Sequence, residues 1–534
     1  MHTTTLLHEL ISASAQRAPA SAALTSGATT LSYQELDAQV AGFAASLIAL
    51  GLDRGERVGI FLDKRVETVV ASFGTARAGG AFVPVNPILK GEQIGHILRD
   101  CNARVLVTSP ERLPLLADTL AHCHDLRQVV LTGPLTQPLE LRSISIHLWS
   151  ELLASPPRSG HRIVDNDLLA ILYTSGSTGR PKGVVLSHRN MVAGAKSVAT
   201  YLGNTPDDTL LAALPLSFDA GFSQLTTAFH SGARVVLLNY LLPQDVLKAL
   251  VKEKVTGLTA VPPLYIQLAQ LKWPETVTEH LRYFANTGGR MPLETLKALR
   301  AHLPRTQPFL MYGLTEAFRA TYLPPDQVDR RPDSIGKAIP NAEVLVLRED
   351  GSECSPNEPG ELVQRGAHVA LGYWNDVEKT AERFKPLPAT APGRQAGFVL
   401  PEIAVFSGDT VRRDEEGYLY FIGRRDEMMK TSGYRVSPTE VEEILYSTQM
   451  VGECVSFGVP HPALGHSICV IATGKDGAPL DSAALLAECR QRMPAYMVPA
   501  VIEVREGPLP RNPNGKIDRK TLSTEFENSN KVQS

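Results

Sequence analysis

The sequence predicts an α/β protein: a large N-terminal domain of mainly parallel, helix-covered β-sheets with a β-rich subdomain, followed by a small α+β C-terminal domain. Three observations support this fold class. Apolar runs typical of buried strands alternate with amphipathic helical patterns as far as Tyr312, as in parallel sheets. Beyond Ile335, short strands are separated by Gly and Asp turns. At 534 residues, the chain is too long for a single hydrophobic core.

The first part of the chain alternates helix and strand signals. Ser32 and Glu35 form a capping box at the start of an amphipathic helix, and Gly51 ends it. From Gly133 to Arg162 the pattern gives way to Pro, Ser and polar residues, which predicts a connector. The strands predicted before this connector cover residues 57–62, 81–86 and 104–107, with helices at residues 64–78 and between the last two strands.

The same rhythm resumes after the apolar run 168–172 and the glycine-rich loop that follows it. It indicates further strands and helices of a parallel sheet. The predicted strands cover residues 210–214, 234–238, 258–261, 283–286 and 309–312, and two of the helices between them cover residues 243–254 and 292–302.

A domain boundary is predicted near Gly423. We expect an N-terminal domain of residues 1–423, a hinge at residues 424–426, a small domain of residues 427–522 and a disordered, polar tail of residues 523–534. The elements predicted in the small domain are helices at residues 438–446 and 482–492 and strands near residues 455–459 and 468–473.

Charge and composition exclude several classes of function. The formal net charge is −3, so electrostatics gives no case for a nucleic acid or a membrane surface as partner. The six cysteines are scattered without a Cys-x-x-Cys pair, which argues against a disulfide framework and a zinc site. The N-terminal segment, with Glu9 and Arg17 in a helical pattern, is unlike a signal peptide, and no apolar run reaches the ~18 residues of a membrane span. We therefore predict a cytoplasmic protein.

The stretch from Tyr173 to Gly183 reads Tyr-Thr-Ser-Gly-Ser-Thr-Gly-Arg-Pro-Lys-Gly and leaves a buried strand. Its glycines let the backbone approach a ligand, while hydroxyls and two cationic side chains supply donors and positive charge. Such a loop can hold phosphate oxygens. It is not a Walker-type loop, because Gly183 rather than Ser or Thr follows Lys182. A flexible surface loop is the alternative.

Seven further stretches follow this loop in order along the chain. They are Met-Tyr-Gly-Leu-Thr-Glu at 311–316, Gly-Glu-Leu at 360–362, Gly-Tyr-Trp at 372–374, Ser-Gly-Asp at 407–409, Gly-Arg-Arg-Asp at 423–426, Lys-Thr-Ser-Gly-Tyr-Arg at 430–435 and Asn-Gly-Lys at 514–516. Together with the loop they resemble the motifs of the AMP-forming adenylating superfamily, which contains acyl-CoA synthetases, peptide-synthetase adenylation domains and luciferases.

The resemblance implies a small, mobile C-terminal domain, an active site between the two domains and a reaction in two steps. A carboxylate attacks the α-phosphate of MgATP and gives an acyl-adenylate and pyrophosphate. The C-terminal domain then rotates, and a thiol displaces AMP to form a thioester. Because ATP is strongly negative and a carboxylate is a poor nucleophile, the protein must neutralise charge and align the reactants.

The resemblance also implies roles for motif residues. Lys182 should steady the departing pyrophosphate, Thr315 should contact the α-phosphate, and Glu316 should hold Mg²⁺ through oxygen ligation. Asp409 should bind the ribose hydroxyls, with Arg424 as a second ribose or phosphate contact. Taken alone, Glu316 would be a solvated acid at a helix start and Asp409 a turn residue. The remaining implied ATP contacts are Thr174, Ser175, Gly176, Ser177, Thr178, Gly179 and Tyr312.

Three C-terminal residues match positions linked to the domain rotation. Lys516 matches the lysine that enters the site only in the adenylating conformation and bridges the substrate carboxylate and the α-phosphate. Asp426 matches the hinge. Gly433 matches the loop that swings in for the thiol step, where glycine would leave room for a pantetheine arm. An isolated lysine in a basic loop would otherwise be solvent-exposed, so the motif carries the role of Lys516.

Asp219 is the predicted contact for a substrate ammonium group. The stretch Phe218-Asp219 resembles peptide-synthetase adenylation domains that take α-amino acids, and a buried carboxylate needs a partner. The alternative is that Asp219 caps the helix starting near Ala220. The other expected pocket walls are mostly small or apolar, which predicts a small amino acid such as proline or alanine. They are Ala220, Ser223, Ala260, Ala285, Thr287, Met311, Arg319 and Ala320.

Arg319 is the charged residue among these walls. Its planar fork suits a second carboxylate on the substrate, and the alternative is an ion pair within the protein. The stretches 313–319 and 217–219 look most like two stand-alone groups. One is the AMP-forming acyl-CoA ligases associated with exosortase systems, and the other is the ligases that load proline onto a carrier protein.

The predicted function is therefore an AMP-forming acid–thiol ligase for a small, amino-bearing acid. No carrier domain follows Lys516 in this sequence, so we expect the phosphopantetheine thiol of a separate carrier protein or of coenzyme A as acceptor, and a monomer or homodimer. The alternatives are a conventional acyl-CoA synthetase acting on a fatty or aryl acid and, from another class, a non-catalytic nucleotide-binding module.

Overall fold

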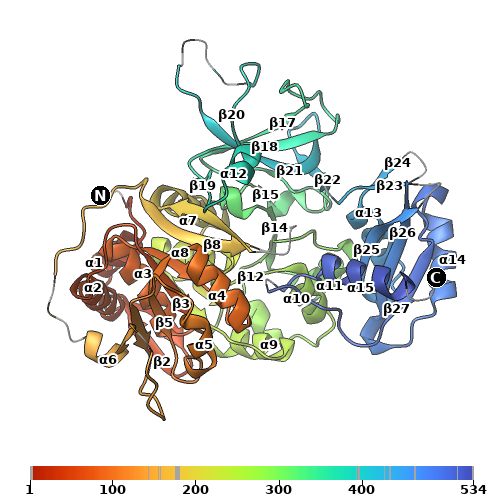
Figure 1. The fold of residues 1–534 in the computed structure, drawn as a ribbon. Helices are drawn as coiled ribbons and strands as arrows, with labels where there is room; N and C mark the ends of the chain where they lie inside the picture. Colours follow the sequence, from red (N-terminus) through yellow and green to blue (C-terminus); the bar gives the residue numbers. More distant parts are fainter. Residues whose placement is uncertain are drawn as a thin grey trace.

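The computed structural model describes residues 4–141, 143–153, 156, 158–174, 181–392, 394, 397, 399–425, 427–431, 434–461, 465–513 and 515–531. Three parts are visible in Figure 1: a large body coloured red to green, a β-rich part in teal above it, and a small domain in blue at its side. The predicted fold class, α/β with mainly parallel sheets and a small C-terminal domain, is confirmed.

One main sheet has nine strands among the described residues, in the order β16-β15-β14-β13-β12-β10-β11-β1-β2. Neighbours from β14 to β1 run parallel, and the outer pairs run antiparallel. Its strands are β1 (Ala22–Ser26), β2 (Thr29–Ser32), β10 (Thr209–Ala212), β11 (Arg234–Leu237), β12 (Gly257–Ala260), β13 (Tyr283–Asn286), β14 (Gln307–Tyr312), β15 (Thr321–Leu323) and β16 (Lys337–Ala338). The five strands that the sequence predicts between residues 210 and 312 are all present.

A second main sheet has eight strands in the described part of the chain, in the order β19-β9-β8-β4-β3-β5-β6-β7. All neighbours from β8 to β7 are parallel. Its strands are β3 (Arg57–Phe61), β4 (Ala81–Pro84), β5 (Ala103–Thr108), β6 (Gln128–Leu131), β7 (Ser145–Leu148), β8 (Leu168–Thr174), β9 (Lys182–Ser187) and β19 (Gly372–Tyr373).

Helices from both halves of the large domain pack between and around these sheets. Phe222 stacks on Phe82 with ring centroids 4.8 Å apart and on Phe73 with centroids 5.9 Å apart. Aromatic burial of this kind dominates core energetics, so it anchors the helix that carries Phe222. The helices are α1 (Glu9–Arg17), α2 (Tyr33–Ala49), α3 (Val66–Ala78), α4 (Gly91–Asp100), α5 (Ala117–Leu120), α6 (Trp149–Leu152), α7 (His188–Leu202), α8 (Asp219–Ser231), α9 (Pro243–Lys252), α10 (Pro262–Ala269) and α11 (Leu293–His302).

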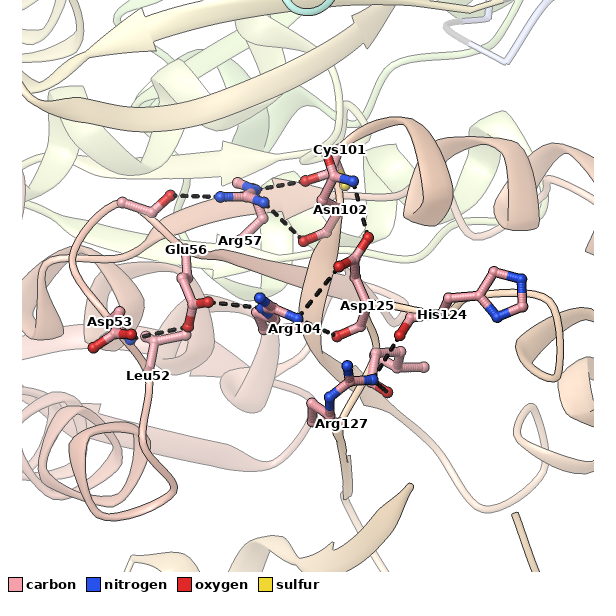
Figure 2. Close-up of polar contacts among 12 residues, drawn as sticks. Leu52, Asp53, Glu56, Arg57, Cys101, Asn102, Arg104, His124, Asp125 and Arg127 are labelled. Atoms are coloured by element: carbon pink, nitrogen blue, oxygen red, sulfur yellow. Dashed lines mark hydrogen bonds and ion pairs between the residues drawn. The ribbon is translucent and has the colours of Figure 1, made fainter. Parts of the chain in front are cut away.

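A polar network closes the amino ends of β3, β5 and β6 (Figure 2). Arg104 pairs with Glu56 at 2.7 Å and with Asp125 at 3.3 Å. Arg57 donates to the carbonyl oxygens of Cys101 and Asn102 at 2.5 and 2.9 Å. Since ligands of parallel sheets bind beyond the carboxyl ends of the strands, this network supports the sheet from the side away from the candidate site.

The β-rich subdomain and the small domain follow. Antiparallel pairing links the subdomain strands β17 (Ala342–Leu347), β18 (Gly360–Gly366), β20 (Phe384–Pro386), β21 (Ile403–Arg413) and β22 (Leu419–Arg424), beside α12 (Val377–Arg383). The small domain contains β23 (Met429–Thr431), β24 (Tyr434–Val436), β25 (Val451–His461), β26 (Gly465–Gly474) and β27 (Val501–Val504), with α13 (Pro438–Ser447), α14 (Ser482–Arg492) and α15 (Arg519–Lys531).

The structure differs from the sequence-based expectation at two places. Residues 133–162 are predicted as a connector, but β7 and α6 form there, and Trp149 stacks on Phe43 with centroids 4.6 Å apart. The predicted disordered tail from residue 523 is instead part of α15, as far as Lys531. Phe526 is buried and packs edge-on against Phe457. A few apolar side chains carry this packing, so the polar composition of the segment hides it.

The six cysteines are unpaired and buried, and burial raises the pKa of Cys101 to about 12 and that of Cys469 to about 11. Among the helices formed by the described residues, none combines the length and apolar character needed to cross a membrane.

Candidate active site

The predicted phosphate loop joins two paired strands. Thr174 ends β8 and Lys182 begins β9, and the two residues pair directly in the antiparallel register, so the loop leaves and returns at one point. The predicted contacts Ser175, Gly176, Ser177, Thr178 and Gly179 lie outside the described residues. The Lys182 ammonium is 5.9 Å from the ring centroid of Tyr373 on β19.

Tyr373 connects this lysine to the predicted magnesium ligand. Its hydroxyl donates to Glu316 Oε1 at 2.6 Å, and Glu316 lies in a short 3₁₀ turn, η3 (Thr315–Ala317). Burial and the adjacent Glu316 carboxylate raise the pKa of Tyr373 well above its usual range. The described residues contain no cluster of three or more His, Cys, Asp or Glu side chains for a metal. A single carboxylate still fits Mg²⁺, which is usually bound by one or two carboxylates with phosphate and water.

The predicted ribose contacts come together at the subdomain. Tyr312, at the end of β14, donates its hydroxyl to Asp409 Oδ2 at 2.5 Å, and Arg424 Nε donates to Asp409 Oδ1 at 3.2 Å. Asp409 and Arg424 are direct partners in the β21–β22 register. Burial raises the pKa of the Asp409 carboxyl, while Arg424 opposes that rise. These two contacts fix the orientation of a buried carboxylate.

Arg383 is a residue of this region that sequence reasoning missed. The Arg383 guanidinium lies against Gly408, whose φ of +71° favours glycine. The positive charge of Arg383 also favours the ionised form of Asp409, and so lowers the pKa of that carboxyl. No motif around Arg383 could have identified it.

Lys516 of the small domain lies inside the site of the large domain. Asn86 Nδ2 donates to the Pro513 carbonyl at 2.7 Å and holds the loop. The Lys516 ammonium is 5.9 Å from the ring centroid of Phe218, and its Cε lies 3.2 Å from where a Cβ on Gly288 would be. Burial lowers the pKa of Lys516, and Asp219 is the largest influence that opposes this.

A second contact between the domains involves Glu443 on α13. Its carboxylate accepts a hydrogen bond from the backbone N–H of Leu293 at 3.1 Å and lies 3.8 Å from Arg290 Nε. Leu293 is the first residue of α11, and a carboxylate at a helix N-terminus is stabilised by the helix dipole. Sequence reasoning missed Glu443, because a single acid on an amphipathic helix carries no signal. The hinge residue Asp426 and Gly433 lie outside the described residues.

Asp219 and Arg319 form a buried ion pair. Arg319 Nη1 is 3.2 Å from Asp219 Oδ2, and the side chains are 3% and 4% exposed. Asp219 is the first residue of α8, and a hydrogen bond from the backbone N–H of Ala220 lowers the pKa of its carboxyl, so a contact at the helix start accompanies the ion pair. Burial raises the pKa of the Asp219 carboxyl, and the Arg319 charge opposes this. From the sequence, Arg319 is expected either to pair with a second carboxylate on the substrate or to form an ion pair within the protein. In the structure it forms the ion pair within the protein.

The backbone at Phe318 directs Arg319 toward this partner. Phe318 has φ = 55°, which is strained for a bulky residue. Its ring is fully buried and occupies the space where a Cβ on Gly194 would lie, 2.3 Å from the ring atom Cδ1. The Arg319 N–H bonds to the Ala317 carbonyl at 2.6 Å. Gly194 on α7, which has no side chain, thus leaves room for the Phe318 ring and permits the turn that orients Arg319.

A cavity of about 10 Å³ lies beside the ion pair, between α7, α8 and the nine-stranded sheet. Four predicted pocket residues line it: Ala220, Ser223, Met311 and Arg319. Thr287, Ala260, Ala285 and Ala320, also predicted, are buried but are not among its lining residues. The lining also includes polar residues that sequence reasoning missed, namely Gln224, Thr227 and Thr259. They lie deeper along α8 and in β12, where buried polar residues cannot be told from core by pattern.

Two family models match this chain. The family described as AMP-binding enzyme matches residues 11–374, and the AMP-binding enzyme C-terminal domain matches residues 440–516. The chain belongs to the AMP-binding enzyme family. It is thus an AMP-forming ligase that adenylates a carboxylic acid, and the family pair of domains corresponds to the large and small domains of the structure.

The relatives of this AMP-binding enzyme have different names. The long-chain-fatty-acid–CoA ligase of Escherichia coli O157:H7 is 30% identical, covering 93% of this chain and 90% of that protein. Bacitracin synthase 1 of Bacillus licheniformis is also 30% identical, over 97% of this chain but 9% of that protein. The solved structure of the anthranilate CoA ligase AuaEII with anthranoyl-AMP has a TM-score of 0.86, 25% identity and 97% coverage of both chains.

Removing one charge of the buried pair should destabilise the large domain. Arg319→Met leaves Asp219 buried without its partner and should lower the free energy of unfolding by about 3–5 kcal/mol. The double variant Asp219→Asn/Arg319→Met removes both charges and should recover most of this loss. Denaturant unfolding followed by tryptophan fluorescence measures the large domain, since it contains all three tryptophans. Equal instability of the single and double variants would contradict this account.

Proposed function

We propose that this enzyme activates a small carboxylic acid bearing an amino group and transfers it to a phosphopantetheine thiol of coenzyme A or of a separate carrier protein. The observation that carries the proposal is the position of Asp219. Its carboxylate is 4% exposed, and its charge raises the pKa of Lys516, the lysine held in the site by the small domain. A substrate carboxylate drawn to Lys516 brings an amino group on its α-carbon toward Asp219.

The charges of the chain suit adenylation of such an acid. Lys516 counters the negative charge that builds up between the substrate carboxylate and the α-phosphate, and Thr315 contacts that phosphate. Removal of one such group from a preorganised site typically costs about 10²–10³-fold in rate. Asp409, Tyr312 and Arg424 hold the ribose, while Thr174 and Lys182 hold the departing pyrophosphate.

Glu316 would hold Mg²⁺, which neutralises phosphate charge when bound. Its orientation is set by the Tyr373 hydroxyl at 2.6 Å. For the second step we propose that the small domain rotates about Asp426 and that Gly433 lines the path of the thiol.

A conventional acyl-CoA synthetase for a fatty or aryl acid is the second candidate. It is favoured by the Asp219–Arg319 pair at 3.2 Å, because Asp219 then has a partner without a substrate ammonium, and by the names of the ligase relatives. The cavity beside the pair argues against a long hydrocarbon chain, since it has about the room that one water needs.

Lys516→Ala should reduce acid-dependent ATP–pyrophosphate exchange by at least about 100-fold, because it removes the cation that counters charge in the adenylation step. Thioester formation from preformed acyl-adenylate should be retained. Lys520→Ala, an exposed lysine on the following helix, is the matched control and should match the wild type. Equal loss of both half-reactions would exclude the proposed role.

Asp219→Asn should lower kcat/KM for amino acids by about 10- to 100-fold, because it removes a hydrogen bond between the substrate ammonium and a charged group, and the loss of such a bond has an effect of this size. For the corresponding acids without the amino group, kcat/KM should fall little. The measurement is pyrophosphate exchange with paired amino and desamino acids, after a thermal melt shows that the variant is folded. If the ratio of kcat/KM for the amino acid to kcat/KM for its desamino partner is the same in the variant and the wild type, the acyl-CoA synthetase is favoured.

Glu443→Ala should weaken docking of the small domain in the adenylating position. Loss of a carboxylate at a helix N-terminus is worth about 1 kcal/mol, or about 5-fold in the docking equilibrium. Pyrophosphate exchange should fall by that factor, while thioester formation from preformed adenylate should not. Glu440→Ala, exposed on the same helix, is the control, and an equal effect of the two variants would argue against the contact.

A further inference from the structure

Three buried polar atoms of cavity-lining side chains lack partners. Gln224 Oε1, Thr227 Oγ1 and Arg319 Nε make no hydrogen bond with any residue that the structure describes. The three side chains are 5%, 1% and 3% exposed, and all three line the same cavity. A buried polar group without a partner costs about 1–3 kcal/mol, so three around one small space indicate a group that satisfies them.

The donor and acceptor roles of two of these atoms are determined by their neighbours. Gln224 Nε2 donates to the carbonyl oxygens of Leu211 and Thr259, at 2.9 and 3.1 Å. These bonds from α8 to β10 and β12 orient the amide, so Oε1 is left to accept. Arg319 Nε can only donate. Thr227 Oγ1 can do either. A group in the cavity must therefore carry both a donor and an acceptor.

The charge of the group is also constrained. Arg319 is the one ionic residue among the described residues that line the cavity, and Asp219 already neutralises it at 3.2 Å. A carboxylate would add a negative charge beside Asp219 in a buried site, and a cation would face Arg319. Both arrangements cost free energy through like-charge repulsion and desolvation.

We propose that this cavity binds the distal end of the acid substrate and selects an uncharged group that both donates and accepts hydrogen bonds, namely a hydroxyl or a carboxamide. The inference rests on the proposed function, since it places the side chain of the activated acid beyond Asp219. The volume of about 10 Å³ fits one polar group rather than a hydrocarbon chain. Gln224, Thr227 and Arg319 Nε are then specificity determinants.

The test is pyrophosphate exchange with near-isosteric pairs: L-threonine against L-valine, L-asparagine against L-leucine, and 3-hydroxybutyrate against 3-methylbutyrate. In each pair that is used, the polar member should exceed its apolar partner in kcat/KM by at least about 10-fold, because an apolar group leaves buried polar atoms unpaired. L-Asparagine should also exceed L-aspartate. Equal use of the polar and apolar members, a preference for L-aspartate, or exchange with none of these acids would overturn the inference.

Thr227→Val supplies the residue-level test. It removes a hydroxyl that has no partner among the described residues, so thermal stability should be unchanged or higher, while the polar-over-apolar ratio should fall several-fold. The matched control is Thr226→Val, because the neighbouring Thr226 is equally buried but its hydroxyl bonds to the Ser223 carbonyl at 3.2 Å. Its ratio should equal that of the wild type. An unchanged ratio in Thr227→Val, or a lower melting temperature with the ratio retained, would show a purely structural role.

The same panel separates this inference from the proposed function. If the enzyme prefers the polar member only among the acids without an amino group, the cavity assignment stands and an amino-acid substrate is excluded. If the enzyme uses amino acids but does not distinguish polar from apolar members, the amino-acid substrate stands and the cavity assignment is excluded.

Discussion

The buried ion pair between Asp219 and Arg319 is the interaction on which the substrate side of the site depends. Burying two charges costs several kcal/mol for each, and their attraction offsets this only when both partners are held in place. Asp219 begins α8, which Phe222 anchors through its aromatic contacts in the core between the sheets. Arg319 follows the strained turn at Phe318. The start of α8, the tight turn at Phe318 and the polar cavity therefore form one arrangement. A change to the charge of Asp219 or of Arg319 affects all three parts.

The two lysines of the site differ in how they are held. Lys182 begins β9 and belongs to the rigid sheet of the large domain. Lys516 reaches the site from the small domain, through the loop that Asn86 binds and with the docking contact of Glu443 on α11. In the proposed function, Lys182 therefore belongs to the site in every position of the small domain, whereas Lys516 would assist the attacking carboxylate only while the small domain is docked. Such a division suits a protein that must complete one half-reaction before it allows the other.

Sequence reasoning identified much of this protein because its signals are local. Strands such as β13 and helices such as α14 lie where apolar periodicity predicts them, and the capping box at Ser32 and Glu35 forms as expected. The motif residues Tyr312, Asp409 and Arg424 come from separate strands and meet in space. The helix that contains Phe526 escaped prediction, because its packing partner Phe457 lies on a distant strand.

The sequence by itself determined the fold class and the family, since each is written in contiguous motifs whose order is maintained along the chain, and the same motifs predict the residues around the nucleotide. Only the tertiary structure decided what Asp219 and Arg319 do. They are 100 positions apart, and nothing in the local pattern of either residue shows that a helix start and a strained turn bring their charges within 3.2 Å. The same holds for Gln224 and Thr227. A buried polar side chain looks the same in sequence whether or not its polar atoms are hydrogen-bonded, and only the positions of its neighbours reveal which atoms have no partner.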